Sequence, residues 1–267
     1  MAKEARASNE EIQYLIDLMR ATAKVTRPVT VDQVVDFSFP TKARKNRAGA
    51  LKENGGAMFE FEGRQIPSEL NEIVDPKRTV LLVWDMQNDQ AGGSFNKEAL
   101  IHNAPPLIGA AAKAGIKTVY TRQTPFLWKD EAVTWIRRAM RDQKVDRPEK
   151  LKPRRLHGSF GWNIMEPFKP GPDDLVIDKR RPSMFVGNEF ETILHNRGAT
   201  TIVMIGCTTD GGVEMTVRDG HNRGHLMVIA RDCVGTYTEE GHNAALKRIE
   251  RFADVVDSEQ LIDIWRR

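Results

Sequence analysis

The sequence predicts an α/β protein with a doubly wound, mostly parallel six-stranded sheet of the Rossmann-like kind, flanked by helices. From Thr79 onward, short continuous apolar runs alternate with amphipathic stretches, and this alternation is typical of parallel strands joined by covering helices. Glycine follows three of the helical stretches, at Gly115, Gly198 and Gly224, where a residue in the left-handed conformation commonly ends a helix. The length of 267 residues allows one large domain with a sizeable core.

The elements of this sheet follow one another in a regular order. The predicted strands are the apolar runs at residues 79–85, 117–122, 174–178, 201–206, 226–232 and 253–257. The predicted helices lie between them at 97–114, 130–142, 188–197, 213–223 and 238–251, and "SEQLIDIWRR" forms a last helix. In such folds ligands bind at the carboxyl ends of the strands, so candidate site residues are sought there.

The N-terminal part of the chain has a different pattern. Residues 9–24 place apolar side chains on one face and predict an amphipathic helix. Residues 26–76 hold scattered proline, glycine and basic residues with only short apolar pieces, which predicts an extended arm with one small hairpin. We therefore expect an arm over residues 1–75 and a main domain over residues 76–267.

Composition and charge exclude several classes of protein. The net charge of +3 gives no reason to expect nucleic-acid binding. No apolar run approaches the length of about 20 residues that spans a bilayer, so we expect no membrane partner. Cys207 and Cys233 both lie in apolar strand ends, which favours a reducing compartment over a disulfide framework. The first 30 residues lack the apolar core of a signal peptide. We expect a cytoplasmic protein.

Polar residues at the predicted strand ends are the first site candidates. Asp85 ends an apolar run, where a carboxylate is costly to bury without a partner. Lys179 directly follows the third strand and is placed to meet Asp85 across the strand ends. Gln123 and Trp128 follow the second strand and offer a polar contact and an apolar wall. The alternatives are a solvated basic cluster at 179–181 and plain packing of the aromatic side chain.

Other motifs of known chemistry do not occur in the chain. There is no GxGxxG, P-loop, GxSxG or HExxH pattern. The histidines have no paired metal-ligand spacing, because His221 and His225 straddle the helix-ending Gly224. The basic stretch 137–155 is a solvated connection or, as a second possibility, a surface that attracts anionic substrates.

Several stretches together resemble one family. They are "TVLLVWDMQND", "DLVIDKRRPSMFVGNEFETILHNRGATTIVMIGCTTDGGVEMTVRDG" and "LMVIARDCVG", and "GSFGW" at 158–162 agrees with them. In this order they resemble the isochorismatase-like hydrolases, the cysteine hydrolase superfamily, over Pro76 to Trp265. The phrase "VEMTVRDG" is most similar to the ureidoacrylate and N-carbamoyl amidohydrolase branch. The resemblance implies an isochorismatase-like fold and hydrolysis of a small-molecule substrate without a cofactor.

The resemblance implies an Asp-Lys-Cys site in which the cysteine is missing. The family's aspartate falls on Asp85, its lysine on Lys179, and its nucleophilic cysteine on Gly212. The family also implies a cis peptide between Cys207 and Thr208. The amides of Thr208 and Gly212 would then form an oxyanion hole. Cys207 occupies an ordinary apolar position and is not expected to be the nucleophile.

Further expectations concern ligands and assembly. The family's occasional metal site uses an aspartate and histidines that "TRQTPF" lacks, so no metal is expected. Gln90 stands where the family commonly has an aromatic residue and alters one pocket wall. Gln123, Trp128 and Trp162 are the predicted substrate contacts, and Arg181 or the 137–155 stretch is placed to hold a carboxylate. Family members usually assemble, so we expect a homodimer or homotetramer with the N-terminal arm at the interface.

Three hypotheses follow from Gly212. In the first, the chain is an amide or ureide hydrolase whose cysteine has been replaced. In the second, Asp85 acts as general acid on a vinyl ether of the isochorismate type, since family members with that activity also carry glycine there. The dry pocket that favours the acid form is opposed by Lys179. In the third, the chain is a binding module that has lost catalysis.

Overall fold

The computed structural model describes residues 58–267 of the chain, which form one compact unit. The helix predicted at 9–24 lies outside the described residues, as does most of the predicted arm. The predicted small hairpin is present as strands β1 (Phe59–Phe61) and β2 (Arg64–Ile66), paired antiparallel. The unit therefore begins ahead of residue 76, where the sequence placed the start of the main domain.

The segment before residue 76 is tied to the main sheet by hydrogen bonds. Helix α4 (Leu70–Ile73) follows the hairpin. The Thr201 hydroxyl donates to the carbonyl of Ile73 at 2.6 Å, and the Trp265 indole N–H donates to the carbonyl of Val74 at 3.0 Å. Val74 itself is fully buried. These contacts attach the segment to the core even though its sequence has no long apolar run.

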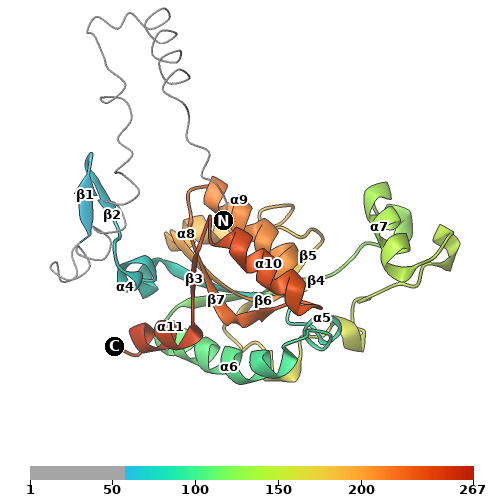
Figure 1. Cartoon of the computed structure of the whole chain (residues 1–267), viewed down its shortest axis with the longest axis horizontal. Helices are drawn as coiled ribbons and strands as arrows, with labels where there is room; N and C mark the ends of the chain where they lie inside the picture. The colour runs from blue at the N-terminus through green and yellow to red at the C-terminus, as the bar shows by residue number, and fades with distance from the viewer. Residues whose placement is uncertain (1–57) are drawn as a thin grey trace, which may run out of the picture. The chain divides into compact units, whose positions relative to one another are not determined.

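A six-stranded sheet forms the centre of the unit, as predicted (Figure 1). Its strand order is β5–β4–β3–β6–β7–β8, and all of these neighbours pair in parallel. The strands are β3 (Thr79–Trp84), β4 (Lys117–Gln123), β5 (Leu175–Lys179), β6 (Thr201–Cys207), β7 (Leu226–Gly235) and β8 (Asp254–Val256). From β3 the chain adds β4 and β5 toward one edge of the sheet, and it then adds β6, β7 and β8 toward the other edge. The strand order therefore switches between β3 and β6, and a ligand site is expected where these two strands end.

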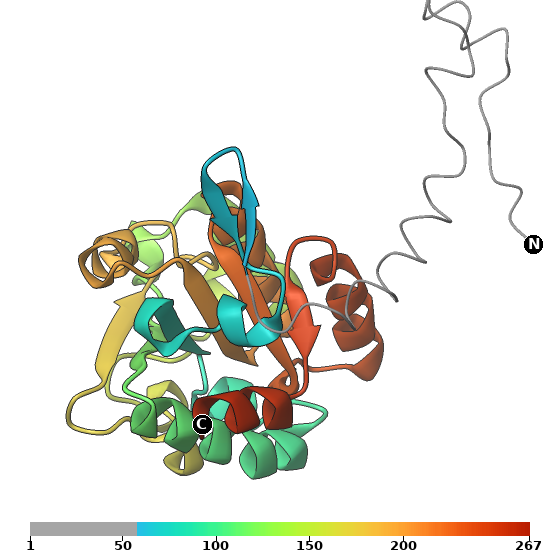
Figure 2. The same cartoon turned by 90° about the vertical axis from the view of Figure 1, so that its left-hand side faces the viewer.

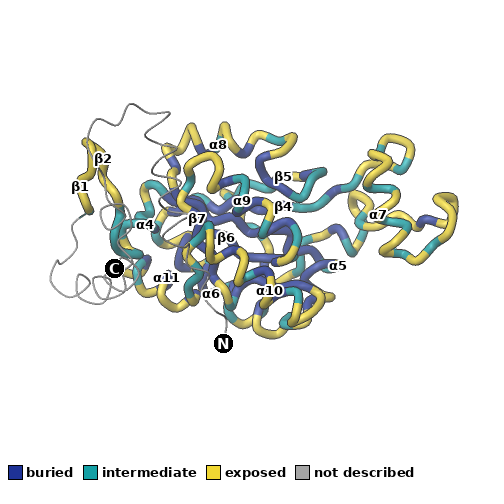
Figure 3. Tube along the Cα trace, turned by 45° about the horizontal axis from the view of Figure 1, so that its top comes forward, coloured by how far each residue is buried: buried dark blue, intermediate teal, exposed yellow. Residues whose placement is uncertain are grey.

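Helices cover both faces of this sheet, which explains the continuous apolar strands (Figure 2). In β3, Leu81 and Val83 face one layer, while Leu82 and Trp84 face the other. The first layer contains α6 (Lys97–Lys113) and α11 (Ser258–Trp265). The second contains α8 (Phe190–Arg197), α9 (Glu214–Asn222) and α10 (Glu239–Ile249). The strands between the layers are the most buried part of the tube in Figure 3.

Glycine ends the helices as the sequence indicated. Gly115, Gly198 and Gly224 have φ angles of 73°, 61° and 83°. These angles lie in the left-handed region, where a side chain would be strained and glycine is favoured. The prediction of helix ends from glycine is therefore confirmed at all three positions.

Between β4 and β5 the chain makes a long excursion. It contains helix α7 (Val133–Gln143), none of whose residues is buried. Figures 1 and 3 show α7 beyond the ends of β4 and β5, apart from the helices that cover the sheet. This excursion supplies one wall of the pocket described below. None of the helices within residues 58–267 is both long and apolar enough to cross a membrane.

Candidate active site

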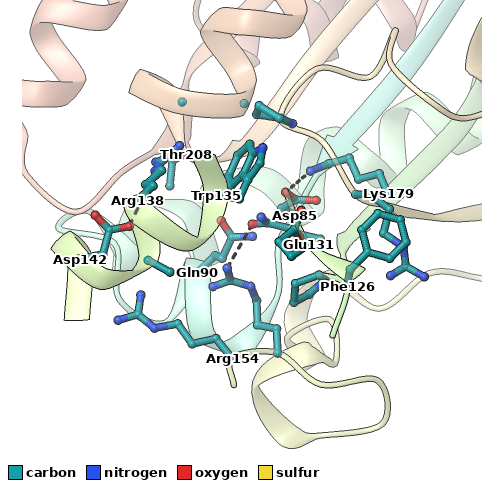
Figure 4. A pocket seen from close by; sticks show the side chains of 18 of the residues that line it. Asp85, Gln90, Phe126, Glu131, Trp135, Arg138, Asp142, Arg154, Lys179 and Thr208 are labelled. Atoms are coloured by element: carbon teal, nitrogen blue, oxygen red, sulfur yellow. Dashed lines mark hydrogen bonds and ion pairs between the residues drawn. The ribbon is translucent and has the colours of Figure 1, made fainter. Parts of the chain in front are cut away.

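A pocket of about 480 Å³ lies at the carboxyl ends of β3, β4, β5 and β6. In Figure 4 a dashed line joins Lys179 to Asp85, and Trp135 and Arg138 of α7 are drawn among the side chains that line the pocket. The charged residues that line it are Asp85, Glu131, Arg138, Asp142, Arg154, Arg155, Lys179 and Arg180. The aromatic ones are Trp84, Phe126, Trp128, Trp135 and Tyr237. The pocket therefore combines flat apolar walls with an excess of positive charge.

Asp85 and Lys179 form a buried ion pair in this pocket. The Lys179 Nζ lies 2.6 Å from Asp85 Oδ2, and both side chains are at most 3% exposed. Asp85 directly follows β3 with a φ of 44°, a left-handed conformation that aspartate tolerates better than most residues. Lys179 is the last residue of β5. The sharp turn at Asp85 directs its carboxylate across the intervening strand β4 toward the lysine.

Thr121 of β4 completes the surroundings of the aspartate. Its hydroxyl donates to Asp85 Oδ1 at 2.6 Å and accepts from the Asp85 backbone N–H at 2.9 Å. Each carboxylate oxygen of Asp85 thus accepts a short hydrogen bond, one from a hydroxyl and one from an ammonium. The carboxylate is thereby fixed in position between Thr121 of β4 and Lys179 of β5.

Lys179 lies between a negative charge and an aromatic ring. Its Nζ is 3.9 Å from the ring centroid of Trp84, which is a cation–π contact. Burial lowers the pKa of Lys179 below its ordinary value, the Asp85 carboxylate acts in the opposite direction, and the Arg155 guanidinium adds to the lowering. The carboxylate and the indole together hold the ammonium at the base of the pocket.

The Trp84 indole also fills the space beside Gly212. A Cβ atom on Gly212 would lie 2.4 Å from Trp84 Cζ2 and Nε1. Real Cβ atoms do not approach other atoms this closely, and the indole is only 1% exposed and cannot move freely. A cysteine at position 212 therefore does not fit next to Trp84 in its present position.

The two cysteines present do not replace the missing one. Cys207 and Cys233 are fully buried, and neither lines the pocket. Burial raises the pKa of the Cys207 thiol to about 12, and it raises the pKa of Cys233 as well. A thiol becomes a strong nucleophile only as the thiolate. The peptide between Cys207 and Thr208 is cis, as the resemblance implied.

The other predicted site residues take different places. Thr208, Gly212, Gln123 and Trp128 line the pocket. Trp162 does not: its indole N–H donates to the Thr124 hydroxyl at 2.8 Å, and its ring lies beneath the Arg122 guanidinium at 3.8 Å. Trp162 is not among the residues that line the pocket, and its role as a substrate contact stays a prediction.

Arg181 is likewise paired instead of open to a ligand. Its Nη1 lies 3.0 Å from Glu131 Oε1, a carboxylate that is 5% exposed. The arginine that lines the pocket is its neighbour Arg180, which donates to the Thr124 carbonyl and lies over the Phe126 ring. The ion pair with Glu131 weighs against Arg181 as the holder of a substrate carboxylate, which stays a prediction.

Three residues of the site, Thr121, Trp84 and Gln87, were not predicted from the sequence. Thr121 lies inside a strand, and only the strand order brings it to Asp85. Trp84 reads as an ordinary apolar residue, although a bulky aromatic directly before Asp85 was a usable signal. Gln87, fully buried, accepts from the Gln123 backbone N–H at 2.8 Å and from Gln90 at 3.3 Å, and it orders both pocket residues.

The described part of the chain contains no group of three or more histidine, cysteine, aspartate or glutamate side chains arranged to hold a metal ion. The polar side chains that the structure brings into contact at the strand ends are Asp85, Lys179 and Thr121.

Comparison with known proteins identifies the family. The model of the isochorismatase domain matches residues 79–260. The chain belongs to the isochorismatase family. This isochorismatase-family chain is 28% identical to the ureidoacrylate amidohydrolase RutB of Caulobacter segnis, over 67% of the chain and 82% of that protein. The RutB of Pantoea ananatis is 30% identical over 68% and 80%. The chain is thus a distant relative of amidohydrolases.

Solved structures agree on the fold of this isochorismatase-family chain. A cysteine hydrolase from Pseudomonas syringae pv. phaseolicola superposes with a TM-score of 0.61 at 19% identity, covering 80% of this chain and 99% of that one. The N-carbamoylsarcosine amidase from Thermoplasma acidophilum gives a TM-score of 0.55 at 21% identity, covering 68% and 97%. At these identities the likeness concerns the fold alone.

Proposed function

We propose that the chain is a hydrolase of the C–N bond in small amide, ureide or carbamoyl compounds that activates water at Asp85 and forms no covalent intermediate at position 212. The observation that supports this most directly is the Trp84 indole in the space beside Gly212. The distant relation to amidohydrolases supports the class of bond.

The proposed reaction uses groups that line one pocket. Asp85 takes a proton from water, and the resulting hydroxide attacks the substrate carbonyl carbon. The carbonyl oxygen becomes an oxyanion, which accepts hydrogen bonds from the backbone amides of Thr208 and Gly212. When the C–N bond breaks, Asp85 returns its proton to the departing nitrogen. Lys179 remains an ammonium beside Asp85 throughout and stabilises its charged form.

The packing argues against the hypothesis of a single replaced cysteine. If only residue 212 differed from an active cysteine enzyme, the space for a side chain there would remain open. Instead a buried tryptophan fills it and contacts Lys179. The buried Asp85–Lys179 pair argues against the binding-module hypothesis. Burying two charges costs desolvation energy, and a catalytic role for the pair would explain why that cost is retained.

Vinyl-ether hydrolysis is the second candidate, favoured by glycine at position 212. That reaction requires Asp85 to give a proton to the substrate at the outset. Both carboxylate oxygens of Asp85 already accept hydrogen bonds from donors, Thr121 at 2.6 Å and Lys179 at 2.6 Å. The distant relation to amidohydrolases favours a C–N bond over a vinyl ether, so the C–N hydrolase is preferred.

The test is a panel of primary amides, ureides, carbamoyl compounds and isochorismate. We expect the full-length protein to release ammonia from at least one nitrogen compound, and Asp85→Asn to reduce kcat by about 100-fold or more. Exposed Lys129→Gln, which removes a charge outside the pocket, is the control. Turnover of isochorismate alone would select the second candidate. No turnover of any member by the wild type would support a binding module.

A further inference from the structure

Arg155 is held in an uncommon conformation at the pocket. Its φ is 48°, in the left-handed region that an arginine rarely occupies. Residues held in such conformations gather at ligand sites, where surrounding structure over-determines them. Here the side chain lines the same pocket as Asp85 and Lys179. The backbone of Arg155 thus positions a guanidinium at the candidate site.

The Arg155 guanidinium is incompletely satisfied. Its Nη2 donates to Gln123 Oε1 at 3.2 Å, but its Nε is buried and has no hydrogen-bond partner within residues 58–267. No carboxylate of the described residues forms an ion pair with it, whereas Arg138 and Arg181 are paired at 3.7 Å and 3.0 Å. A buried donor without a partner is unfavourable. An anionic ligand that accepts a hydrogen bond from Arg155 would remove this cost.

A second donor in the pocket lacks a partner. The Trp128 Nε1 is buried and unbonded within the described part of the chain, and Trp128 lines the pocket. An indole N–H can only donate. Trp128 Nε1 and Arg155 Nε are the two buried side-chain atoms of residues 58–267 that lack a partner. Both therefore require an acceptor that the protein does not provide.

Electrostatics favour a negatively charged acceptor. The charge of Arg155 acts on Lys179 and contributes to the lowering of its pKa, although burial is the larger cause. Lys179 is paired with Asp85, whereas no carboxylate of residues 58–267 forms an ion pair with the second cation, Arg155. A ligand anion at Arg155 would offset the repulsion between these cations, since opposite charges attract strongly where water is scarce. The aromatic side chains Phe126 and Trp135 nearby suit a flat organic body attached to that anion.

We propose that Arg155 and Trp128 form an anion subsite that binds a carboxylate of the substrate and thereby selects small amide or ureide acids over neutral amides. Both residues line the same pocket, and each of their unpartnered N–H groups can donate to a carboxylate oxygen. Its substrate class rests on the proposed function, because the subsite is assigned to the same molecule whose carbonyl meets Asp85. Binding at the subsite does not require turnover and is measured separately.

The test compares two probes of the same shape. Isothermal titration of the full-length protein uses 4-ureidobenzoate and 4-tolylurea, in which a methyl group replaces the carboxylate. We expect the wild type to bind the carboxylate probe at least about 30-fold more tightly. Arg155→Gln reduces this preference to within about threefold, and Trp128→Phe reduces it about fivefold. The control Lys129→Gln, also a loss of one positive charge, keeps the preference.

Two further variants protect the result against misfolding and misassignment. Arg155→Lys keeps the charge without the planar fork of donors and is expected to keep about a tenth of the preference. Arg154→Gln tests the neighbouring arginine, which lines the pocket but is exposed. Thermal unfolding of every variant shows whether it is folded. A wild type without preference, weak or absent binding of both probes, or a preference lost in Arg154→Gln and retained in Arg155→Gln overturns the subsite.

Ammonia release from 4-ureidobenzoate and from the panel separates this proposal from the proposed function. Arg155-dependent binding without hydrolysis of any panel member supports the subsite and contradicts the hydrolase. Hydrolysis of a panel member without Arg155-dependent preference supports the hydrolase and overturns the subsite.

Discussion

The indole of Trp84 fills the space in which a side chain at position 212 would lie. The closest atoms would be 2.4 Å from a Cβ on Gly212, and Trp84 is buried between the sheet and α9. The two positions are therefore coupled by size: tryptophan at 84 requires glycine at 212. This coupling supports the proposal that the glycine belongs to a functional site.

The first prediction concerns this coupling. Gly212→Cys is expected to lower the free energy of unfolding by about 1–3 kcal/mol, because it overpacks the core against Trp84. Adding Trp84→Val makes room, and the double variant is expected to lose less stability than the sum of the two single changes. Urea unfolding of the four proteins measures the interaction energy.

Gly109→Cys provides the matched control for that cycle. Gly109 lies in α6 and has open space around its would-be Cβ, so cysteine there should change stability by at most about 0.5 kcal/mol. If Gly212→Cys is as well tolerated as Gly109→Cys, and the cycle shows no interaction energy, Trp84 does not occupy the site as described.

The second prediction concerns the buried ion pair. Lys179→Met leaves the Asp85 carboxylate buried without its cation, and we expect a loss of about 3–5 kcal/mol in the free energy of unfolding. Replacing both partners, as in Asp85→Leu with Lys179→Met, removes the uncompensated charge and should restore most of that stability. Both proteins should be inactive on the panel. Equal stability of the single and double variants would mean that the pair is not buried in solution.

The sequence predicted most of the sheet and its helices because apolar periodicity reports directly on burial. The run from Thr79 to Trp84 is buried at every position and could be read as a strand covered on both faces. The attachment of Ile73 and Val74 could not be read in this way. It depends on hydrogen bonds from Thr201 and Trp265, which are distant in the sequence and leave no local pattern.

The candidate site was predictable only in part. Asp85 and Lys179 stand at strand ends, where a charge after an apolar run signals chemistry, and their ion pair follows from strand order. The motif around Trp162 could not show on which side of the pocket wall the ring lies, because that depends on three-dimensional packing. The basic stretch 137–155 was a candidate for holding a carboxylate, but the sequence could not select Arg155 within it, since its conformation and missing partner are three-dimensional properties.

The third prediction concerns stability at low pH. Glu214 on α9 pairs with Arg218 at 2.8 Å and with Arg248 of α10 at 2.7 Å. Hydrogen bonds from Arg248, and then from Arg218, lower the pKa of Glu214 below its ordinary value of 4.5. A carboxyl group with a lowered folded-state pKa contributes stability that is present above its unfolded pKa and lost as pH falls through its folded pKa.

Glu214→Gln should therefore cost about 1 kcal/mol at pH 7, since both arginines are partly exposed, and less at pH 3. Urea unfolding at a series of pH values from 7 down to 3 measures the difference. Glu240→Gln, an exposed change on α10 with no ion pair among the described residues, is the control. A Glu214→Gln cost that stays constant as pH falls would contradict the linkage.

The most direct test of the central claim, hydrolysis without a covalent nucleophile, is the mass of the protein during turnover of whichever panel compound it cleaves. The sample is acid-quenched in the steady state, with and without prior iodoacetamide treatment of the native protein. We predict an unmodified mass in the untreated sample and an unchanged rate after treatment, because both thiols are buried. A mass increased by the substrate's acyl group, or inactivation upon alkylation of Cys207, would contradict the account.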